Sequence, residues 1–457
     1  MGKKKPSAEV DMLNGLLLGK IILFALPIAL SGMLQQLFNA ADVAVVGRFA
    51  GSKALAAVGA CGPLVGIFVN LLTGLAIGPN TALAILIGKN DRESISPMIH
   101  TAITFAIFLG LGLTALGFAV VKPVLEASST PAEIMGDALV YIRIYFIAIP
   151  FITVYNFGAA ILRSFGDTKR PMYCLIISGV INVILNLIFV IAFHLDEAGV
   201  AIATVISNVV SCAMVVSFLL KMEGDFRLDI RKLAIDRQHL SRIVKIGVPA
   251  GIQSAIFGIS NIFVQSGINT FGADAIAGVS ASLNWGYLSY FCSTAFSQTA
   301  LTFIGQNYGA GQIQRCRKVV RLCMLIGSLF TATLSFTFII FGKFCMSVYT
   351  TSAVVAEYGI IRLKLCGYFE WLSSVFEVGC SALRGTGQTV QPAIFTILGT
   401  VVYRLIYLAT VFRVSHTFGT LMLVYGTSWI FTTIIVLTAY FIRMRKLEKC
   451  QLAPADR

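Results

Sequence analysis

The sequence predicts an all-α membrane protein, with twelve transmembrane helices in two six-helix bundles related by a pseudo-two-fold axis along the membrane normal. Three observations support this fold class. The chain of 457 residues is 57% hydrophobic and only 12% charged, whereas about a quarter of the residues in a soluble domain are charged. Apolar segments long enough to cross a bilayer recur along the whole chain. Finally, the second half of the chain repeats the first.

Two ten-residue strings show the repeat most clearly. Leu162–Pro171 reads LRSFGDTKRP and Leu383–Pro392 reads LRGTGQTVQP, with five identical positions at a spacing of 221 residues. Pro27 matches Pro249 at nearly the same spacing. Repeats of almost half a chain are too long for a solenoid. In an apolar chain they are typical of secondary transporters.

Twelve almost uncharged segments, six in each half, predict the transmembrane helices, because about 20 apolar residues cross the hydrocarbon core. They are residues 19–47, 54–82, 97–121, 138–163, 172–194, 198–221, 240–269, 275–304, 317–341, 357–384, 391–413 and 417–442. A transmembrane barrel would show alternating segments of about ten residues, and nothing in the chain alternates. The predicted domains are an N-terminal bundle (1–221), a cytoplasmic linker (222–239) and a C-terminal bundle (240–457).

The basic residues predict the orientation of the helices. Most of the 35 Lys and Arg residues lie in the N-terminal arm, the even-numbered gaps between helices and the C-terminal tail. Positive charge collects on the cytoplasmic side, so both termini are expected in the cytoplasm and the protein in the inner membrane. An even number of helices gives both halves the same orientation, with the substrate path between them. The net charge of +14 reflects this bias, and no nucleic-acid partner is expected.

The chain lacks the sequence motifs of several chemical functions. The chain has no GxxxxGKS/T loop, so no ATP site is expected. Its ten cysteines form no CxxC pair, which argues against a metal or disulfide framework. An enzyme embedded in the membrane would need clustered His, Asp or Cys, but the four histidines are scattered. The sequence therefore predicts neither an enzyme nor a cofactor, and a gradient of H+ or Na+ is the expected energy source.

The string LRSFGDTKRP has the residues of a tight turn between two helices. Gly166 permits a sharp helix end, while Asp167 and Thr168 can cap the next helix. Pro171 suits the first turn of that helix. A plain turn with positive-inside charge explains these residue types, but it does not explain why the same string recurs in the second half.

Only three of the 21 acidic residues, Asp42, Glu370 and Glu377, lie well inside predicted helices. An ionised side chain in hydrocarbon costs about 2.5–3.5 kcal/mol on insertion scales. These three residues are therefore the first candidates for ion coupling. Gln35 and Asn39 share one face of the first helix with Asp42, at i, i+4 and i+7.

Polar side chains also form stripes on the fifth and sixth helices. The stripes are Ser178, Asn182 and Asn186 on the fifth helix and Thr204, Asn208 and Ser211 on the sixth. A hard cation prefers oxygen ligands, and these helices together with Asp42 could supply a carboxylate and neutral oxygens. The alternative is that the stripes join helices to one another by hydrogen bonds.

The second half carries charges of both signs. Glu370 and Glu377 are two helical turns apart on one face of the tenth helix, and Arg404 lies near the middle of the eleventh. A buried Arg is seldom left unpaired, so Arg404 is predicted to pair with Glu377, with Glu370 as the alternative partner. The pair is either structural or a site for protons or cationic substrate. Asn156 stands at the first-half position of Glu377. A polar face of the seventh helix, predicted to line the central cleft, comprises Ser254, Asn261 and Gln265.

Taken in order along nearly the whole chain, the motifs resemble those of the multidrug and toxic compound extrusion (MATE) family. They are Leu26-Pro27, Asp42 followed by Val46-Gly47-Arg48, Tyr155-Asn156-Phe157, LRSFGDTKRP, GVAIAT at 199–204, QNYGA at 306–310 and LRGTGQ at 383–388. The resemblance implies cation-driven export of organic molecules by alternating access. The expected partners are amphipathic, often cationic small molecules and the lipid bilayer, and a monomer is expected.

The resemblance also places a cation site on Asp42, Asn182, Asn186 and Thr204. Many relatives have Asp where this chain has Asn186, so the chain departs from the family by one carboxylate. The choice between H+ and Na+ therefore stays open, and the only metal expected is a Na+ at Asp42. The alternative function is a lipid-linked sugar flippase of the related two-bundle plan. A flippase would need a cationic central cleft for pyrophosphate, whereas few Lys or Arg lie mid-membrane.

Overall fold

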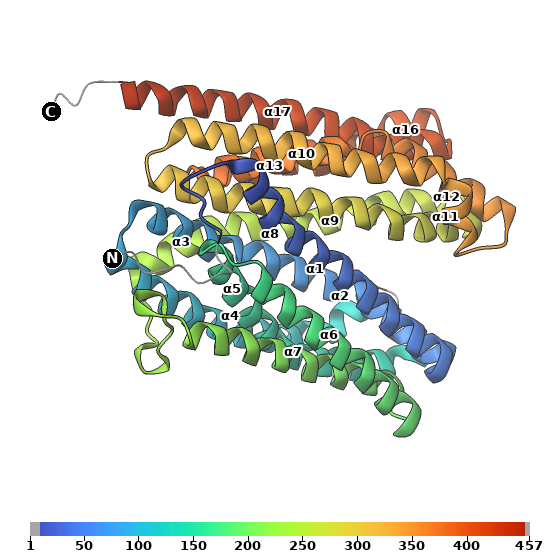
Figure 1. Ribbon diagram of the computed structural model, residues 1–457. Coiled ribbons are helices and arrows are strands. Elements are labelled where there is room, and N and C mark those ends of the chain that lie inside the picture. The colour runs from blue at the N-terminus through green and yellow to red at the C-terminus, as the bar shows by residue number, and fades with distance from the viewer. Residues whose placement is uncertain (1–9, 129, 453–457) are drawn as a thin grey trace. The chain divides into compact units, whose positions relative to one another are not determined.

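In this computed structural model most of the described residues are helical (Figure 1). It describes residues 10–128 and 130–452, with side chains up to Lys449. The elements of the first half are α1 (Leu17–Val45), η1 (Val46–Ala50), α2 (Gly51–Leu75), α3 (Ile77–Lys89), α4 (Arg92–Ala127), α5 (Ala132–Ser164), α6 (Lys169–Leu187), η2 (Ile188–Ala192) and α7 (Asp196–Leu220). The linker holds the 3-10 turns η3 (Gly224–Phe226) and η4 (Ile230–Lys232).

The second half follows the same plan with more interruptions. Its elements are α8 (Arg237–Asn269), α9 (Ala273–Gly309), α10 (Ile313–Ile340), α11 (Gly342–Ser347), α12 (Ala353–Gly367), α13 (Trp371–Gly385), α14 (Val390–Thr396), η5 (Ile397–Val402), α15 (Tyr403–Ala409), α16 (Val411–Val414) and α17 (Phe418–Leu452). Each of the twelve predicted segments corresponds to one helix or to a run of consecutive helices. The described residues contain no strand, and the predicted all-α class is confirmed.

By length and composition, nine helical runs within the described residues could cross a membrane. One of them, Leu17–Lys89, contains two of the predicted helices. Two other predicted segments fall outside this set. Residues 275–304 form the serine-rich α9, and residues 357–384 form α12 and α13. The latter two have 15 residues each, and a helix of that length is about 22 Å long, shorter than the hydrocarbon core.

The contacts divide the chain into two compact units. One unit holds Val10 and Leu30–Gly251, and the other holds Asp11–Ala29 and the chain from Ile252 onward. The divisions fall inside α1 and α8, close after Pro27 and Pro249, which lie inside these helices. Proline lacks the N–H for the helical hydrogen bond and so weakens a helix locally. The domain boundaries predicted above follow the repeat rather than these contacts, and they stay a prediction.

The duplicated turn has the same backbone geometry in both halves. Gly166 and Gly387 adopt positive φ angles of 98° and 84°, a region that glycine enters without steric cost. In both turns the glycine N–H bonds the carbonyl three residues before it, and the following N–H bonds the carbonyl five residues before it. This pair of bonds is the Schellman ending of a helix. The recurring string therefore encodes one helix ending, used twice.

The turn also caps the helix that follows it. Asp167 accepts hydrogen bonds at Oδ1 from the backbone N–H groups of Lys169 (3.0 Å) and Arg170 (3.1 Å). These are donors that the first turn of α6 would otherwise leave without partners. The predicted capping role of Asp167 is confirmed, whereas the side chain of Thr168, the other predicted cap, makes no capping hydrogen bond to the described residues.

The linker packs on the first unit. Leu228 is 1% exposed, and the Phe226 ring lies 4.9 Å from the Phe165 ring, centroid to centroid. The backbone N–H of Asp229 donates to His100 Nε2 of α4 at 3.0 Å. The polar stretch between the halves is therefore attached to the first half by both apolar and polar contacts.

Candidate functional site

The first half gathers a polar cluster around Asp42, in the last turn of α1. Asn186, in the last turn of α6, donates through Nδ2 to Asp42 Oδ1 at 2.5 Å and to Asn182 Oδ1 at 3.3 Å. Asn182 in turn donates to Ser207 Oγ of α7 at 3.5 Å. Three helices thus contribute to one hydrogen-bonded chain, which contains three of the predicted cation-site residues.

The cluster contains an oxygen without a hydrogen-bond partner. Asn186 is 0% exposed and Asn182 is 6% exposed. Within the part of the chain that the structure describes, Asn186 Oδ1 is buried and accepts no hydrogen bond. A buried carbonyl oxygen without a donor is uncommon, because its desolvation is not compensated. This oxygen is therefore available to a cation.

Thr204 adjoins the cluster through its backbone. Its carbonyl accepts a hydrogen bond from Ser207 Oγ at 3.0 Å, while its own hydroxyl donates to the Val200 carbonyl at 2.9 Å. Ser207, which joins Asn182 to α7, was missed by the sequence reasoning. Its spacing of three residues from Thr204 puts both on one helical face, and that was the available signal.

Two buried tyrosines of α5 lie within electrostatic range of Asp42. Tyr141 and Tyr145 are each 8% exposed and lie close enough to interact electrostatically with Asp42. Their stacked rings have centroids 6.3 Å apart. Sequence reasoning missed them because, without the fold, nothing distinguishes these tyrosines from the other aromatic residues.

The remaining first-half candidates lie outside this chain of hydrogen bonds. Gln35 and Asn39 are exposed on α1, and among the described residues neither joins the Asp42 cluster. Asn156 of α5 donates to the Ile152 carbonyl of its own helix at 2.9 Å. Whether these three residues take part in transport stays a prediction.

Among the described residues Arg404 pairs with no acid, so the predicted ion pair with Glu377 or Glu370 is wrong. Its guanidinium, 1% exposed, donates from Nη1 to Asn261 Oδ1 at 3.1 Å and from Nε to Ser428 Oγ at 3.2 Å. Its Cζ lies 4.7 Å from the centroid of the Tyr425 ring. Neutral amide and hydroxyl oxygens and an aromatic face thus take the place of the expected carboxylate. The sequence pointed to an acid because it could not show that Asn261 reaches Arg404.

A serine hydroxyl donates to each second-half candidate acid, to the carboxylate of Glu370 and to the backbone carbonyl of Glu377. Glu370, at the break between α12 and α13, accepts a hydrogen bond from Ser335 Oγ of α10 at 3.0 Å. Arg362 interacts with it electrostatically, but the two form no ion pair among the described residues. The backbone carbonyl of Glu377 accepts from Ser297 Oγ at 3.1 Å. Of the predicted helix-seven face, Gln265 donates to Asn269 Oδ1 at 3.0 Å.

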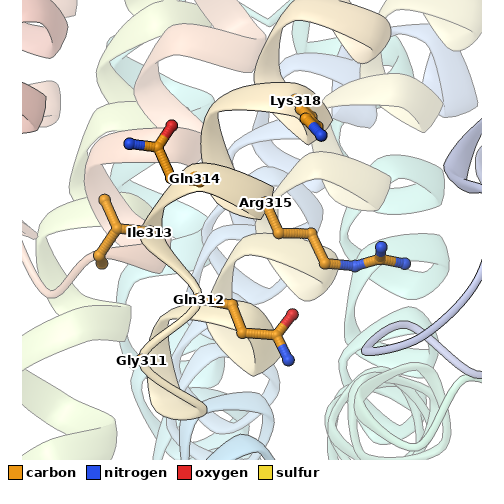
Figure 2. A pocket seen from close by; sticks show the side chains of 6 residues that line it. All are labelled: Gly311, Gln312, Ile313, Gln314, Arg315 and Lys318. Atoms are coloured by element: carbon orange, nitrogen blue, oxygen red, sulfur yellow. The ribbon is translucent and has the colours of Figure 1, made fainter.

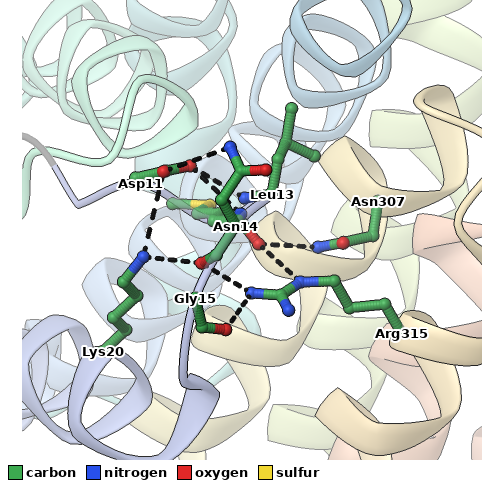
Figure 3. Close-up of polar contacts among 8 residues, drawn as sticks. Asp11, Leu13, Asn14, Gly15, Lys20, Asn307 and Arg315 are labelled. Carbon is green, nitrogen blue, oxygen red and sulfur yellow. Dashed lines mark hydrogen bonds and ion pairs between the residues drawn. The ribbon is translucent and has the colours of Figure 1, made fainter.

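An open pocket lies apart from all these residues, at the start of α10. Gly311 to Arg315 and Lys318 line it (Figure 2). The guanidinium of Arg315 also binds the turn that precedes α1. Its Nη2 donates to the carbonyls of Asn14 (2.9 Å) and Gly15 (3.0 Å) (Figure 3). Because this arginine already has backbone partners, the pocket is a weaker candidate site than the buried polar clusters.

Comparison with known proteins identifies the repeat independently. The family model MatE matches two stretches of the chain, residues 27–188 and 249–410. The two matches have the same length, and their first residues are Pro27 and Pro249. Together they cover most of the chain, and they confirm that its two halves are equivalent.

The chain is similar to drug-resistance proteins over most of its length. It is 26% identical over 384 residues to the probable multidrug resistance protein YoeA of Bacillus subtilis, covering 82% of each chain. It is 24% identical over 382 residues to the multidrug export protein MepA of Staphylococcus aureus, covering 82% of this chain and 83% of that one. A MATE crystal structure in complex with MaL6 superimposes with a TM-score of 0.91 at 21% identity, over 97% of this chain and 100% of that one. The predicted two-bundle fold is confirmed.

Proposed function

Because the chain belongs to the MATE family of multidrug efflux transporters, we propose that it is a secondary active antiporter. It exports amphipathic organic compounds, often cations, and takes up H+ or Na+ in exchange by alternating access. The two halves, which the family model matches separately, supply the two bundles between which a transporter of this kind moves its substrate.

The observation that carries the proposal is the hydrogen bond between Asn186 and Asp42 (2.5 Å) within the first half. It joins Asp42, which lies well inside a predicted transmembrane helix, to a buried amide whose oxygen has no donor among the described residues. A hard cation binds such oxygen ligands, with Asp42 supplying the charge and Asn186, Asn182 and Thr204 supplying neutral oxygens. A proton binds the Asp42 carboxylate alone. Proton and metal ion therefore compete for one group.

Occupation of Asp42 changes what Asn186 does. While the carboxylate is empty and charged, the amide Nδ2 donates to it. When a cation binds, the amide turns so that Oδ1 faces the ion. The π-helical stretches η1 and η2 directly follow the two helix turns that carry these residues. Such stretches are frequent at functional sites, and here they give both helix ends room to adjust.

Drug export is favoured over the flippase alternative. The similar Staphylococcus aureus and Bacillus subtilis proteins carry multidrug export and resistance in their names. The substrate class proposed for this chain is accordingly amphipathic organic compounds, with no enzyme activity and no cofactor besides the coupling ion.

The protein is a multi-span membrane transporter of a cell membrane. We propose that it lies in the cytoplasmic membrane with both termini in the cytoplasm, because of the positive-inside bias of its Lys and Arg residues. We also propose that it acts as a monomer. Its remaining partner is the bilayer itself, against which large apolar side chains such as Leu116 and Phe118 of α4 stay exposed.

The test of this function is Asp42→Asn, measured as efflux of ethidium from cells that lack other drug exporters. The substitution keeps the shape of the side chain and removes its charge and its proton site. Efflux driven by an ion gradient should be abolished, while the protein is still made and inserted. Asp274→Asn, which removes an exposed carboxylate in the first turn of α9, is the matched control and should export normally. Normal efflux by Asp42→Asn would rule the coupling role out.

A further inference from the structure

The second half contains a buried positive charge that the proposed function does not use. Arg404 is 1% exposed and is the largest of the fully buried side chains among the described residues. None of the ion pairs found in that part of the chain includes it. An unpaired arginine within a transmembrane segment is costly and is expected to have a functional partner.

Neighbouring side chains orient the guanidinium of Arg404 but leave one of its nitrogens without a hydrogen-bond acceptor among the described residues. The rings of Phe257 and Tyr425 lie 5.4 Å and 4.7 Å from its Cζ. Asn261 and Ser428 accept from Nη1 and Nε. Nη2 is buried and donates to no acceptor among the described residues. The aromatic rings and the hydrogen bonds orient the group, while one edge of the guanidinium keeps an unused donor.

The repeat shows that this site has a twin of opposite charge. The two family matches are offset by the distance from Pro27 to Pro249. This offset is 249 − 27 = 222 residues, one more than the spacing of the LRSFGDTKRP string, and it aligns Arg404 with Asn182, a member of the Asp42 cluster. In the first half, α1 and α6 bring a carboxylate to an amide, whereas in the second half α8 and α15 bring a guanidinium to an amide.

The resemblance extends to the helix geometry. In the first half the π-helical stretch η2 follows α6, and in the second half η5 ends directly before α15. Both stretches lie in the fifth helix of their half, next to the polar residues of the site. The two halves therefore use the same pair of helices, of which the fifth carries a π-helical stretch in both, to hold groups of opposite charge.

We propose that Arg404 and Asn261 form an anion-binding site that takes the carboxylate of a substrate. This inference deepens the proposed export function and rests on it. The class of substrate is a zwitterionic or acidic amphiphile, whose apolar part contacts the aromatic side chains and whose carboxylate replaces Asn261 at the guanidinium. A carboxylate accepts two parallel N–H bonds from arginine, and Nη1 and Nη2 are the donors.

A route to the arginine passes along α8. Asn261 is exposed while its Oδ1 contacts the buried guanidinium, so this amide separates Arg404 from the surface of its unit. Gln265 and Asn269 continue the row at intervals of one turn and bond each other at 3.0 Å. Such a polar row is unfavourable against lipid and suits a water-filled path.

The experiment uses the purified full-length protein and two fluorescent dyes, a rhodamine with a free carboxylate and its methyl ester, which lacks the negative charge. Binding is measured by fluorescence anisotropy. The decisive variant is Asn261→Asp, which gives Arg404 an internal carboxylate and so preserves the fold. Gln391→Glu adds the same charge at an exposed position of α14, outside the polar row of α8, and is the matched control. Thermal unfolding of each variant is recorded beside the binding.

Asn261→Asp should weaken binding of the acid dye at least about tenfold, since it fills the site with a permanent anion. It should change binding of the ester less than about twofold, and Gln391→Glu should leave the preference for the acid dye in place. The unfolding temperature of Asn261→Asp should equal or exceed that of the unmodified protein. Equal losses for both dyes, or unchanged binding of the acid dye, would overturn the anion site. If the unmodified protein binds and exports the ester but does not bind the acid, the anion site fails while the export function stands.

Discussion

At the scale of single residues, Asn186 decides how much negative charge the first half offers a cation. It stands 2.5 Å from Asp42 through its amide nitrogen and leaves its oxygen without a donor in the described part of the chain. The site therefore has one carboxylate where many relatives are expected to have two. Its affinity for Na+ should be correspondingly low.

Asn186→Asp tests this account of the charge. Two adjacent carboxylates repel when both are ionised, so the variant should be less stable than the unmodified protein in the absence of Na+. A bound cation relieves the repulsion, and ligand binding raises stability with concentration. The variant should consequently show a larger rise in unfolding temperature on addition of Na+ than the unmodified protein does. Choline chloride is the control salt, and identical Na+ responses in both proteins would contradict the prediction.

Arg404 shows where residue-level prediction from sequence fails. As expected for a buried arginine, Arg404 has partners, but they are an amide, a hydroxyl and two aromatic rings and not an acid. Nothing in the sequence places Asn261 of α8 beside α15. For Asp42 the prediction was better, because acids and amides are rare on these apolar helices and their spacing already put Asn182 and Asn186 on one face.

At the scale of structural elements, the two copies of the turn offer a matched comparison. An alanine at either Gly166 or Gly387 must adopt positive φ, which costs about 1–2 kcal/mol. At Gly387 an added Cβ meets no atom within 4 Å, whereas at Gly166 it would lie 2.6 Å from the Val10 carbonyl oxygen. Gly166→Ala should therefore lower the free energy of unfolding by clearly more than Gly387→Ala. Unfolding in detergent measures both variants, and equal losses would show that the Val10 contact does not matter.

The segment before α1 is a second element whose attachment can be tested. Arg315 donates to the carbonyls of Met12 (3.2 Å), Asn14 (2.9 Å) and Gly15 (3.0 Å), as Figure 3 shows. Arg315→Ala removes all three hydrogen bonds, each a charge-assisted one. Amide hydrogen exchange in residues 12–20 should then become at least about tenfold faster.

The control for this change is Arg317→Ala on the same helix. It breaks the ion pair to Glu448 (2.5 Å) and leaves the contacts of Arg315 in place. Exchange in residues 12–20 should stay as in the unmodified protein. If Arg317→Ala accelerates exchange in that segment as much as Arg315→Ala, the three hydrogen bonds do not hold the turn.

At this scale the sequence predicted the helical spans, which follow from composition, but it did not predict a helix break that depends on local backbone geometry. Every predicted span became a helix or a run of helices, because long apolar segments can satisfy their backbone groups in a membrane only by forming helices or closed barrels. The break at Tyr368 to Glu370 was missed. Gly367, at the end of α12, was its sole local signal, and a single glycine is also tolerated inside a helix.

At the scale of the whole molecule, the repeat and the charge bias make a joint prediction. Six helices per half and basic residues on one side require both termini to lie in the cytoplasm. Reporter domains that are active only in the cytoplasm should therefore work when fused to either end. A reporter that is active only outside the cytoplasm, fused to the N- or C-terminus and found active there, would contradict the predicted topology.

The central claim is that an ion gradient drives export through Asp42, and transport in reconstituted vesicles tests it most directly. The purified protein is placed in liposomes, H+ and Na+ gradients are imposed separately, and movement of a fluorescent organic cation is recorded. The account predicts that one of the two gradients drives transport by the unmodified protein and by Asp274→Asn. It also predicts that neither gradient drives transport by Asp42→Asn, although that variant still binds the dye. Transport by Asp42→Asn at the rate of the unmodified protein, under the same gradient, would contradict it.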